Sequence, residues 1–260
     1  MNAPRSVVIT GASSGLGEAL TLRYAACGAR LGLIGRNAAR LEAVAECARQ
    51  TGAAAVETAA LDVRDRTRLA AWIGVFDDRG PIDLLIANAG VVGGTGMAGE
   101  IERADDSEHV FAINVGGTVN TVHAVLPRMV ERRAGQVAIV SSLAGFVRLP
   151  DLPSYSASKA AIMSYALNLR DAVGPLGVRI NVVCPGYIDT PMARQLRGTK
   201  LFEVTPAYAA SAIERGLARD RRIVAFPYAL AAVTRIASVL PGSLVRAFAP
   251  SFRVARREND

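Results

Sequence analysis

Cysteine, histidine and lysine are scarce in this sequence of 260 residues. Its three cysteines, Cys27, Cys47 and Cys184, are far apart and form no CxxC pair, which predicts a reducing compartment and no structural zinc. Two histidines are too few for a metal site built on imidazole, so we predict that no metal is bound. The sequence contains no run of 18 uncharged apolar residues, so it predicts no membrane span. Its first residues do not have the pattern of a secretory signal. We therefore expect a cytoplasmic protein.

Acidic residues are missing from most of the C-terminal segment. The net charge is +7, and residues 221–257 hold seven arginines and no acid. Proteins that bind nucleic acids usually present a basic face with interleaved aromatic residues or a reader module. Aromatic residues make up only 5% of this chain, and no such module is visible. Nucleic-acid binding is not expected.

Short apolar runs alternate with longer amphipathic ones, and 51% of the residues are apolar, which excludes disorder. The predicted strands are Ser6–Thr10, Arg30–Ile34, Val56–Leu61, Ile82–Ala87, Gln136–Ser141, Val178–Cys184 and 221–226, and the predicted helices are 16–27, 38–51, 65–79, 105–133, 154–174 and one that begins at Thr205–Pro206. Such alternation predicts an α/β fold with a doubly wound parallel sheet and helices on both faces. We expect one domain, with residues 1–226 as its body and 227–260 as a helical extension.

The first predicted strand leads into TGASSGLG, Thr10–Gly17, and then directly into a helix. Glycines allow a tight turn and close approach to a pyrophosphate, and a helix N-terminus offers free N–H donors. The spacing GxxxGxG is a variant of the common dinucleotide fingerprint GxGxxG. This turn predicts a dinucleotide site at the carboxyl ends of the strands.

The residue after the second strand indicates which dinucleotide is bound. An enzyme that uses NAD offers an acid there to the ribose hydroxyl, but no acid occurs between Glu18 and Glu42. Arg36 occupies this place instead, and a guanidinium is suited to the 2′-phosphate of NADP. We expect NADP(H) to be favoured over NAD(H).

The segment SYSASKAA contains a tyrosine and a lysine whose spacing lets the two side chains interact. Tyr155 and Lys159 are four residues apart and therefore lie on one face of a helix. A nearby ammonium favours the phenolate, so Lys159 is expected to lower the pKa of Tyr155.

Six motifs occur in order: TGASSGLG, NAG at 88–90, NVGG at 114–117, VSSLAG at 140–145, YSASK and PGYIDT at 185–190. Together they resemble the short-chain dehydrogenase/reductase family in its compact form, over residues 5 to about 192. The resemblance implies a Rossmann-type fold and hydride transfer between a nicotinamide and a carbonyl or alcohol.

The resemblance also implies roles for matching residues. Tyr155 would be the acid/base, Ser142 would bind the substrate oxygen, Lys159 would hold the nicotinamide ribose, and Asn114 would anchor a water near Lys159. The implied cofactor-binding residues are Gly11, Ser13, Ser14, Gly15, Leu16, Gly17, Arg36, Asp62, Val63, Asn88, Ala89, Gly90, Tyr155, Lys159, Pro185, Gly186, Ile188 and Thr190. Asp62 would contact the adenine, and Ile188 and Thr190 the carboxamide.

Alternatives remain for function and for the tail. A non-catalytic NADP-binding scaffold or a membrane-surface interaction protein is the second interpretation of the function. The apolar and arginine-containing tail either packs on the domain, builds a homodimer or homotetramer interface, or lies on the inner membrane surface. A substrate loop is expected at about 191–205, where Arg194, Arg197 and Lys200 bind an anionic group or are simply solvated. The substrate is expected to be a small carbonyl or alcohol, and a hydrophobic one.

Overall fold

The computed structural model describes residues 3–95, 101–197, 200, 202–239 and 255–256. Seven parallel strands form one sheet in the order β3-β2-β1-β4-β5-β6-β8. They are β1 Ser6–Thr10, β2 Arg30–Gly35, β3 Ala55–Ala60, β4 Leu84–Ala87, β5 Gln136–Val140, β6 Arg179–Pro185 and β8 Ile223–Phe226. The predicted α/β class is confirmed, and the predicted strand bounds are correct to within two residues.

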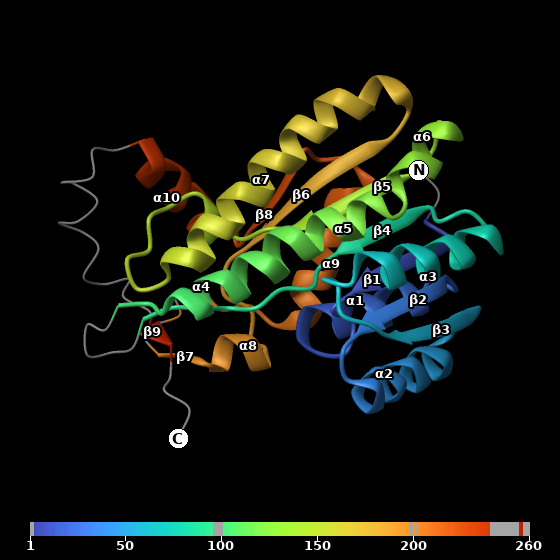
Figure 1. The fold of residues 1–260 in the computed structure, drawn as a ribbon, viewed down its shortest axis with the longest axis horizontal. Coiled ribbons are helices and arrows are strands. Elements are labelled where there is room, and N and C mark those ends of the chain that lie inside the picture. The colour runs from blue at the N-terminus through green and yellow to red at the C-terminus, as the bar shows by residue number, and fades with distance from the viewer. Residues whose placement is uncertain (1–2, 96–100, 198–199, 201, 240–254, 257–260) are drawn as a thin grey trace.

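Helices cover both faces of the sheet (Figure 1). They are α1 Gly15–Ala25, α2 Ala38–Thr51, α3 Arg66–Asp78, α4 Ala104–Phe111, α5 Thr118–His123, α6 Leu126–Glu131, α7 Pro153–Val173, α8 Pro191–Arg194, α9 Pro206–Ala218 and α10 Tyr228–Val239. One core joins the sheet to α3, α5 and α7, and the other joins it to α1, α2 and α9. Because both faces are covered, strands such as β1 and β4 are buried at every residue.

The strand order reverses direction between β1 and β4, since β2 follows β1 to one side and β4 lies on the other. In open α/β sheets, such a switch point leaves a crevice at the carboxyl ends of the strands, where ligands bind. The turn after β1 and the loop after β4 meet at this crevice.

The single helix predicted over 105–133 is wrong in detail. After α4, a π-helical turn at Ala112–Gly117 precedes α5, and a further break separates α5 from α6. A Cβ on Gly117 would overlap Val63, so the two backbones approach closely at the π turn. Pro127 lacks the N–H that would continue the helix from α5, which accounts for the second break.

The helical run Ala104–Glu131 has the length and hydropathy of a membrane span, but half of its apolar window is buried inside the protein. It packs against α3, α7 and the sheet, as the core helices of globular proteins do. This run is therefore weak support for a membrane span.

The described part of the C-terminal segment packs on the domain. β8 completes the sheet, and the side chains of Leu230 and Ala231 on α10 join the core on the α7 side. Ala255–Arg256 forms β9, which pairs antiparallel with β7, Leu196–Arg197 (Figure 1). Residues 240–254, on which the tail interpretations also depended, lie outside the described residues.

Candidate active site

A cavity of about 1540 Å³ opens at the carboxyl ends of the strands. Pockets for one small ligand measure about 300–1,000 Å³, so this cavity has room for a dinucleotide and a second molecule. All but one of the residues predicted for the site line it: Gly11, Ser13, Ser14, Gly15, Leu16, Gly17, Arg36, Asp62, Val63, Asn88, Ala89, Gly90, Ser142, Tyr155, Lys159, Pro185, Gly186, Ile188 and Thr190. The exception is Asn114, which lies behind the wall.

The glycine-rich turn has the shape that a phosphate group needs. Gly11 and Gly15 have φ values of +67° and +58°, which favour glycine. A Cβ on Gly17 would overlap the carbonyl oxygen of Gly11, so only glycine fits there. Ser14 precedes α1 without capping it through its side chain, whereas Asn37 caps α2 through a hydrogen bond. The first N–H groups of α1 are thus available to an anion in the cavity.

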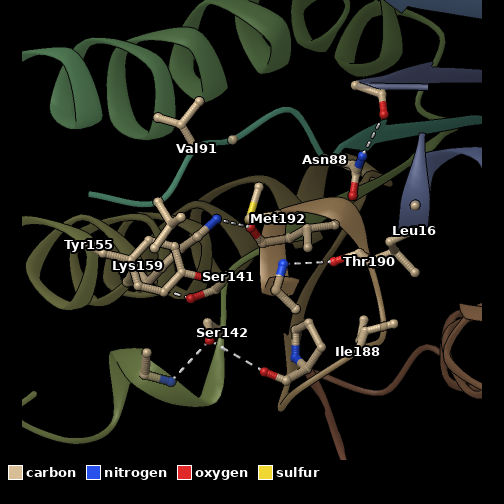
Figure 2. Close-up of a pocket in the computed structure, with 18 of the residues that line it drawn as sticks. Leu16, Asn88, Val91, Ser141, Ser142, Tyr155, Lys159, Ile188, Thr190 and Met192 are labelled. Carbon is tan, nitrogen blue, oxygen red and sulfur yellow. Dashed lines mark hydrogen bonds between the residues drawn. The ribbon is translucent and has the colours of Figure 1, made fainter. Parts of the chain in front are cut away.

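Asn88 fixes the position of this turn. Its side-chain amide donates to the carbonyl oxygens of Thr10, at 3.0 Å, and Gly11, at 3.2 Å. In return, the hydroxyl of Thr10 accepts the backbone N–H groups of Asn88 and Ala89. The loop after β4 and the turn after β1 are therefore joined by four hydrogen bonds. Figure 2 shows the side chain of Asn88 between these two segments.

Two arginines face the cavity at the end of β2. Arg36 follows the strand directly and Arg40 lies on the first turn of α2, and both are exposed. Within the described residues, neither guanidinium has an ion-pair partner within hydrogen-bonding distance. The carboxylate of Asp62 is held by the side chain and backbone N–H of Arg64, which lowers the pKa of Asp62. The positive charge of Arg36 also contributes to this lowering.

Ser142, Tyr155 and Lys159 meet where β5 ends beside the N-terminal part of α7 (Figure 2). The hydroxyl of Ser142 donates to the carbonyl of Pro185 at 3.4 Å and accepts the N–H of Ala144 at 3.1 Å, and it also faces the Tyr155 phenol closely enough to affect the pKa of that group. The ammonium of Lys159 lies 5.8 Å from the centre of the Tyr155 ring and donates to the carbonyl of Val140 at 3.0 Å. By contrast, the Ser141 hydroxyl donates to the backbone carbonyl of Lys159 at 2.7 Å. Ser142, rather than Ser141, is the serine that meets the tyrosine.

Burial controls the ionisation of this group. It raises the pKa of Tyr155 above the ordinary value, although the hydroxyl of Ser142 acts in the opposite direction. It lowers the pKa of Lys159 from 10.5 to about 8. The predicted lowering of the Tyr155 pKa by Lys159 is therefore not seen in this structure, because desolvation of the phenolate outweighs the opposing contribution of Ser142. Tyr155 is protonated at neutral pH and able to donate a proton.

Asn114 is fully buried and supports the cavity from behind. Its side chain accepts the N–H of Val91 at 2.8 Å and donates to the carbonyl of Val91 and to the Ser158 hydroxyl, each at 3.0 Å. Asn114 thus connects the loop after β4 to α7, where its partner Ser158 directly precedes Lys159. The role that the resemblance implies for Asn114, anchoring a water near Lys159, stays a prediction.

The segment after β6 closes another side of the cavity. Thr190 caps α8 by accepting the N–H of Ala193, and its methyl group would lie 3.0 Å from a Cβ on Gly15. Ile188 is buried and forms a bridge with Val204. The segment is thus anchored both to the glycine-rich turn and to the end of the substrate loop.

Sequence reasoning missed several residues of the site. Arg40 was not recognised, although it lies one helical turn from Arg36. Glu102 accepts the N–H of Ser154 at 3.1 Å and its hydroxyl at 2.6 Å, so a carboxylate caps α7 next to Tyr155. No local signal links Glu102 to a helix that begins fifty residues later. The five cavity-lining residues of α10 were also missed: Leu230, Val233, Thr234, Ile236 and Ala237.

The basic side chains expected near the substrate are engaged elsewhere. Arg194 pairs with Asp189 at 3.1 Å, and Lys200 approaches Glu203 at 3.9 Å. Neither Arg194 nor Lys200 is among the residues that line the cavity. The side chain of Arg197 lies outside the described residues. An anion site at Arg194 and Lys200 therefore gains no support.

A doubly wound sheet, an uncapped helix N-terminus and a partly buried Tyr155 beside the buried Lys159 at one cavity are typical of a dinucleotide-binding oxidoreductase. The comparisons make the family explicit, because the family model for short chain dehydrogenases matches residues 5–201. The chain belongs to the short-chain dehydrogenase/reductase family. Members act on CH–OH and C=O groups of small molecules with a nicotinamide cofactor.

Relatives and solved structures agree with this assignment. An uncharacterised oxidoreductase of Myxococcus xanthus is 37% identical over 252 residues, which is 96% of this chain and 98% of the relative. The crystal structure of levodione reductase superposes with a TM-score of 0.78 at 27% identity, covering 88% of this chain and 98% of the other. A short-chain dehydrogenase from Mycobacterium paratuberculosis bound to NAD gives a TM-score of 0.75 at 26% identity, covering 85% and 94%.

Proposed function

We propose that the protein is an NADP(H)-dependent reductase of a hydrophobic carbonyl substrate. The observation that carries the reductase part is the Ser142–Tyr155 hydroxyl pair at the cavity, with Tyr155 protonated at neutral pH. A group that holds its proton at neutral pH is suited to giving that proton to a carbonyl oxygen. The direction of the Tyr155 pKa shift therefore favours reduction.

The preference for NADP(H) is supported by charge. Arg36 and Arg40 both face the cavity at the end of β2, while the carboxylate of Asp62 is neutralised by Arg64. Two free guanidiniums attract a phosphate dianion through charge-assisted hydrogen bonds. An engaged carboxylate is a poorer acceptor for the ribose hydroxyl that NAD presents. Asp62 lines the part of the cavity proposed for the adenine.

The chain is suited to the dinucleotide, because the α1 N-terminus is uncapped and the preceding turn takes the positive φ values that Gly11 and Gly15 allow. A bound nicotinamide supplies the hydride in reduction and accepts it in oxidation. We assign to Ser142 a hydrogen bond to the substrate oxygen, which stabilises the negative charge that develops there. Tyr155 then gives its phenolic proton to that oxygen, so that the carbonyl becomes an alcohol. Lys159 stabilises the resulting phenolate and holds the nicotinamide ribose.

Calorimetric titration with NADPH and NADH tests the cofactor proposal. Arg36→Ala and Arg40→Ala each remove one charge, and Arg66→Ala, an exposed arginine that does not line the cavity, is the matched control. A hydrogen bond to a charged group contributes about 1.5–3 kcal/mol, so each cavity variant should bind NADPH roughly 10- to 150-fold more weakly. Binding of NADH should stay constant. Equal NADPH affinity in Arg36→Ala and wild type would refute the proposed phosphate site.

The non-catalytic scaffold is the second candidate, and turnover separates it from the reductase. Consumption of NADPH with a panel of ketones and aldehydes is expected for wild type and not for Tyr155→Phe, while NADPH affinity is the same in both. NADPH binding without consumption of any carbonyl would favour the scaffold.

Location and assembly belong to the same proposal. All three cysteines are free, with Cys27 and Cys47 exposed, which suits the cytoplasm. The exposed apolar side chains Val233 and Ile236 on α10 line the cavity, so a membrane contact is not needed to account for them. A homo-oligomer stays a prediction, to be measured by sedimentation.

A further inference from the structure

One helical face of α10 forms a wall of the cavity. Leu230, Val233, Thr234 and Ala237 follow the spacing of a single face, and Ile236 lies beside them. Leu230 lies beside the end of β6, because a Cβ on Gly186 would lie 2.9 Å from its side chain, and the carbonyl of the preceding Pro185 accepts the hydroxyl of Ser142. At 1.5 Å per residue, the wall extends about 10 Å from Leu230 to Ala237.

Exposure differs between the two edges of this wall. Leu230 and Thr234 are buried, at 6% and 9% exposure, whereas Val233 and Ile236 are 48% and 61% exposed. Branched apolar side chains that line a cavity and also face water leave apolar area that a ligand can cover. The wall therefore has a buried edge at Leu230 and Thr234 and an exposed apolar edge at Val233 and Ile236.

Other parts of the cavity lining are also apolar. They include Val92, Val110, Leu149, Leu152, Met192 and Leu196, of which Val92, Leu152 and Leu196 form an apolar cluster against which Leu149 and Tyr155 pack. Charged residues of both signs, Asp106, Asp151 and Arg148, line the cavity as well. Because these charges have mixed sign, they do not select an ionic head group of one sign. A compact polar carbonyl compound would leave most of the apolar surface uncovered.

We propose that α10 binds the long apolar chain of the substrate and that Val233 and Ile236 set the preference for chain length. This inference rests on the proposed function in one respect, since the carbonyl is assigned to Ser142 and Tyr155. The substrate class is then an aliphatic ketone or aldehyde whose chain lies along α10 and covers its exposed apolar edge.

The test is calorimetric titration with 2-alkanones of 6, 8, 10 and 12 carbons, with and without NADPH. Each buried methylene strengthens binding by up to about fourfold, so the affinity of wild type should rise along the series. The double variant Val233→Ser with Ile236→Ser should bind 2-hexanone as wild type does but lose most of the gain for longer chains. Tyr228→Ser is the matched control, because Tyr228 is 67% exposed on the same helix and does not line the cavity.

Two results would overturn the inference. One is a wild-type affinity that does not increase with chain length, which includes the absence of binding. The other is an equal increase in wild type and in the double variant. NADPH consumption measured on the same ketones reports separately on the proposed function. Chain-length-dependent binding without turnover supports the α10 inference and contradicts the reductase, whereas turnover without chain-length dependence does the reverse.

Discussion

Replacing Lys159 by methionine removes a buried positive charge, and the structure predicts how stability then responds to pH. Lys159 is 5% exposed, and burial lowers its pKa from 10.5 to about 8. Between these values the unfolded chain binds a proton that the folded chain has released, so the free energy of unfolding of wild type rises with pH. One pKa unit corresponds to about 1.4 kcal/mol, so the charged ammonium costs about 3 kcal/mol below pH 8.

Urea unfolding of wild type and Lys159→Met measures this cost. Other titrating groups occur in both proteins, so the difference between them isolates Lys159. Relative to the variant, wild type should gain about 2 kcal/mol between about pH 7.5 and pH 9.5. Lys159→Arg is the matched control, because a guanidinium keeps its charge over this pH range. The free energy of unfolding of wild type should therefore rise relative to Lys159→Arg by a similar amount. Parallel stability curves for wild type and Lys159→Met would refute the argument that burial depresses this pKa.

The remaining predictions concern proton donation and the buried amide behind the cavity. The rate of carbonyl reduction should stay flat from about pH 6 to about pH 8 and decline above, as Lys159 loses its proton while Tyr155 still holds its own. A decline centred below pH 7 would mean that Tyr155 ionises more easily than its burial implies. Asn114→Ala removes three hydrogen bonds from a fully buried site, and the backbone N–H and C=O of Val91 each lose the partner that Asn114 provided. The free energy of unfolding, measured in urea, should therefore fall by roughly 2–5 kcal/mol. A loss below about 1 kcal/mol would contradict this supporting role.

The sheet and the glycine-rich turn are local features, so the sequence could predict them. Strands such as β4 are continuous apolar runs, and TGASSGLG combines a turn with a helix start. The helical run from residue 104 to 131 was harder, because its interruption depends on how closely Gly117 approaches Val63. No residue pattern within the run reveals that contact, whereas the second break follows from Pro127, which the sequence does show.

The candidate site was predictable where it depends on local sequence motifs. Motif residues lie at fixed places after strands, and all the predicted ones but Asn114 line the cavity. Arg40 and the lining face of α10 depend on how a helix is oriented over the sheet. Glu102 reaches α7 from a distant loop. Spacing along the chain does not contain that information.

The ionisation of the Tyr–Lys pair shows where sequence spacing stops being sufficient. A spacing of four residues places Tyr155 and Lys159 on one helical face, and from that alone the ammonium was expected to lower the tyrosine pKa. The structure adds that both groups are desolvated and that Val140 accepts a hydrogen bond from the ammonium. Burial disfavours the charged form of each group, so it raises the pKa of Tyr155 and lowers that of Lys159. Because loss of one proton from Lys159 would then control both the stability difference and the decline in reduction, the rise in stability should begin near pH 8, where reduction begins to decline.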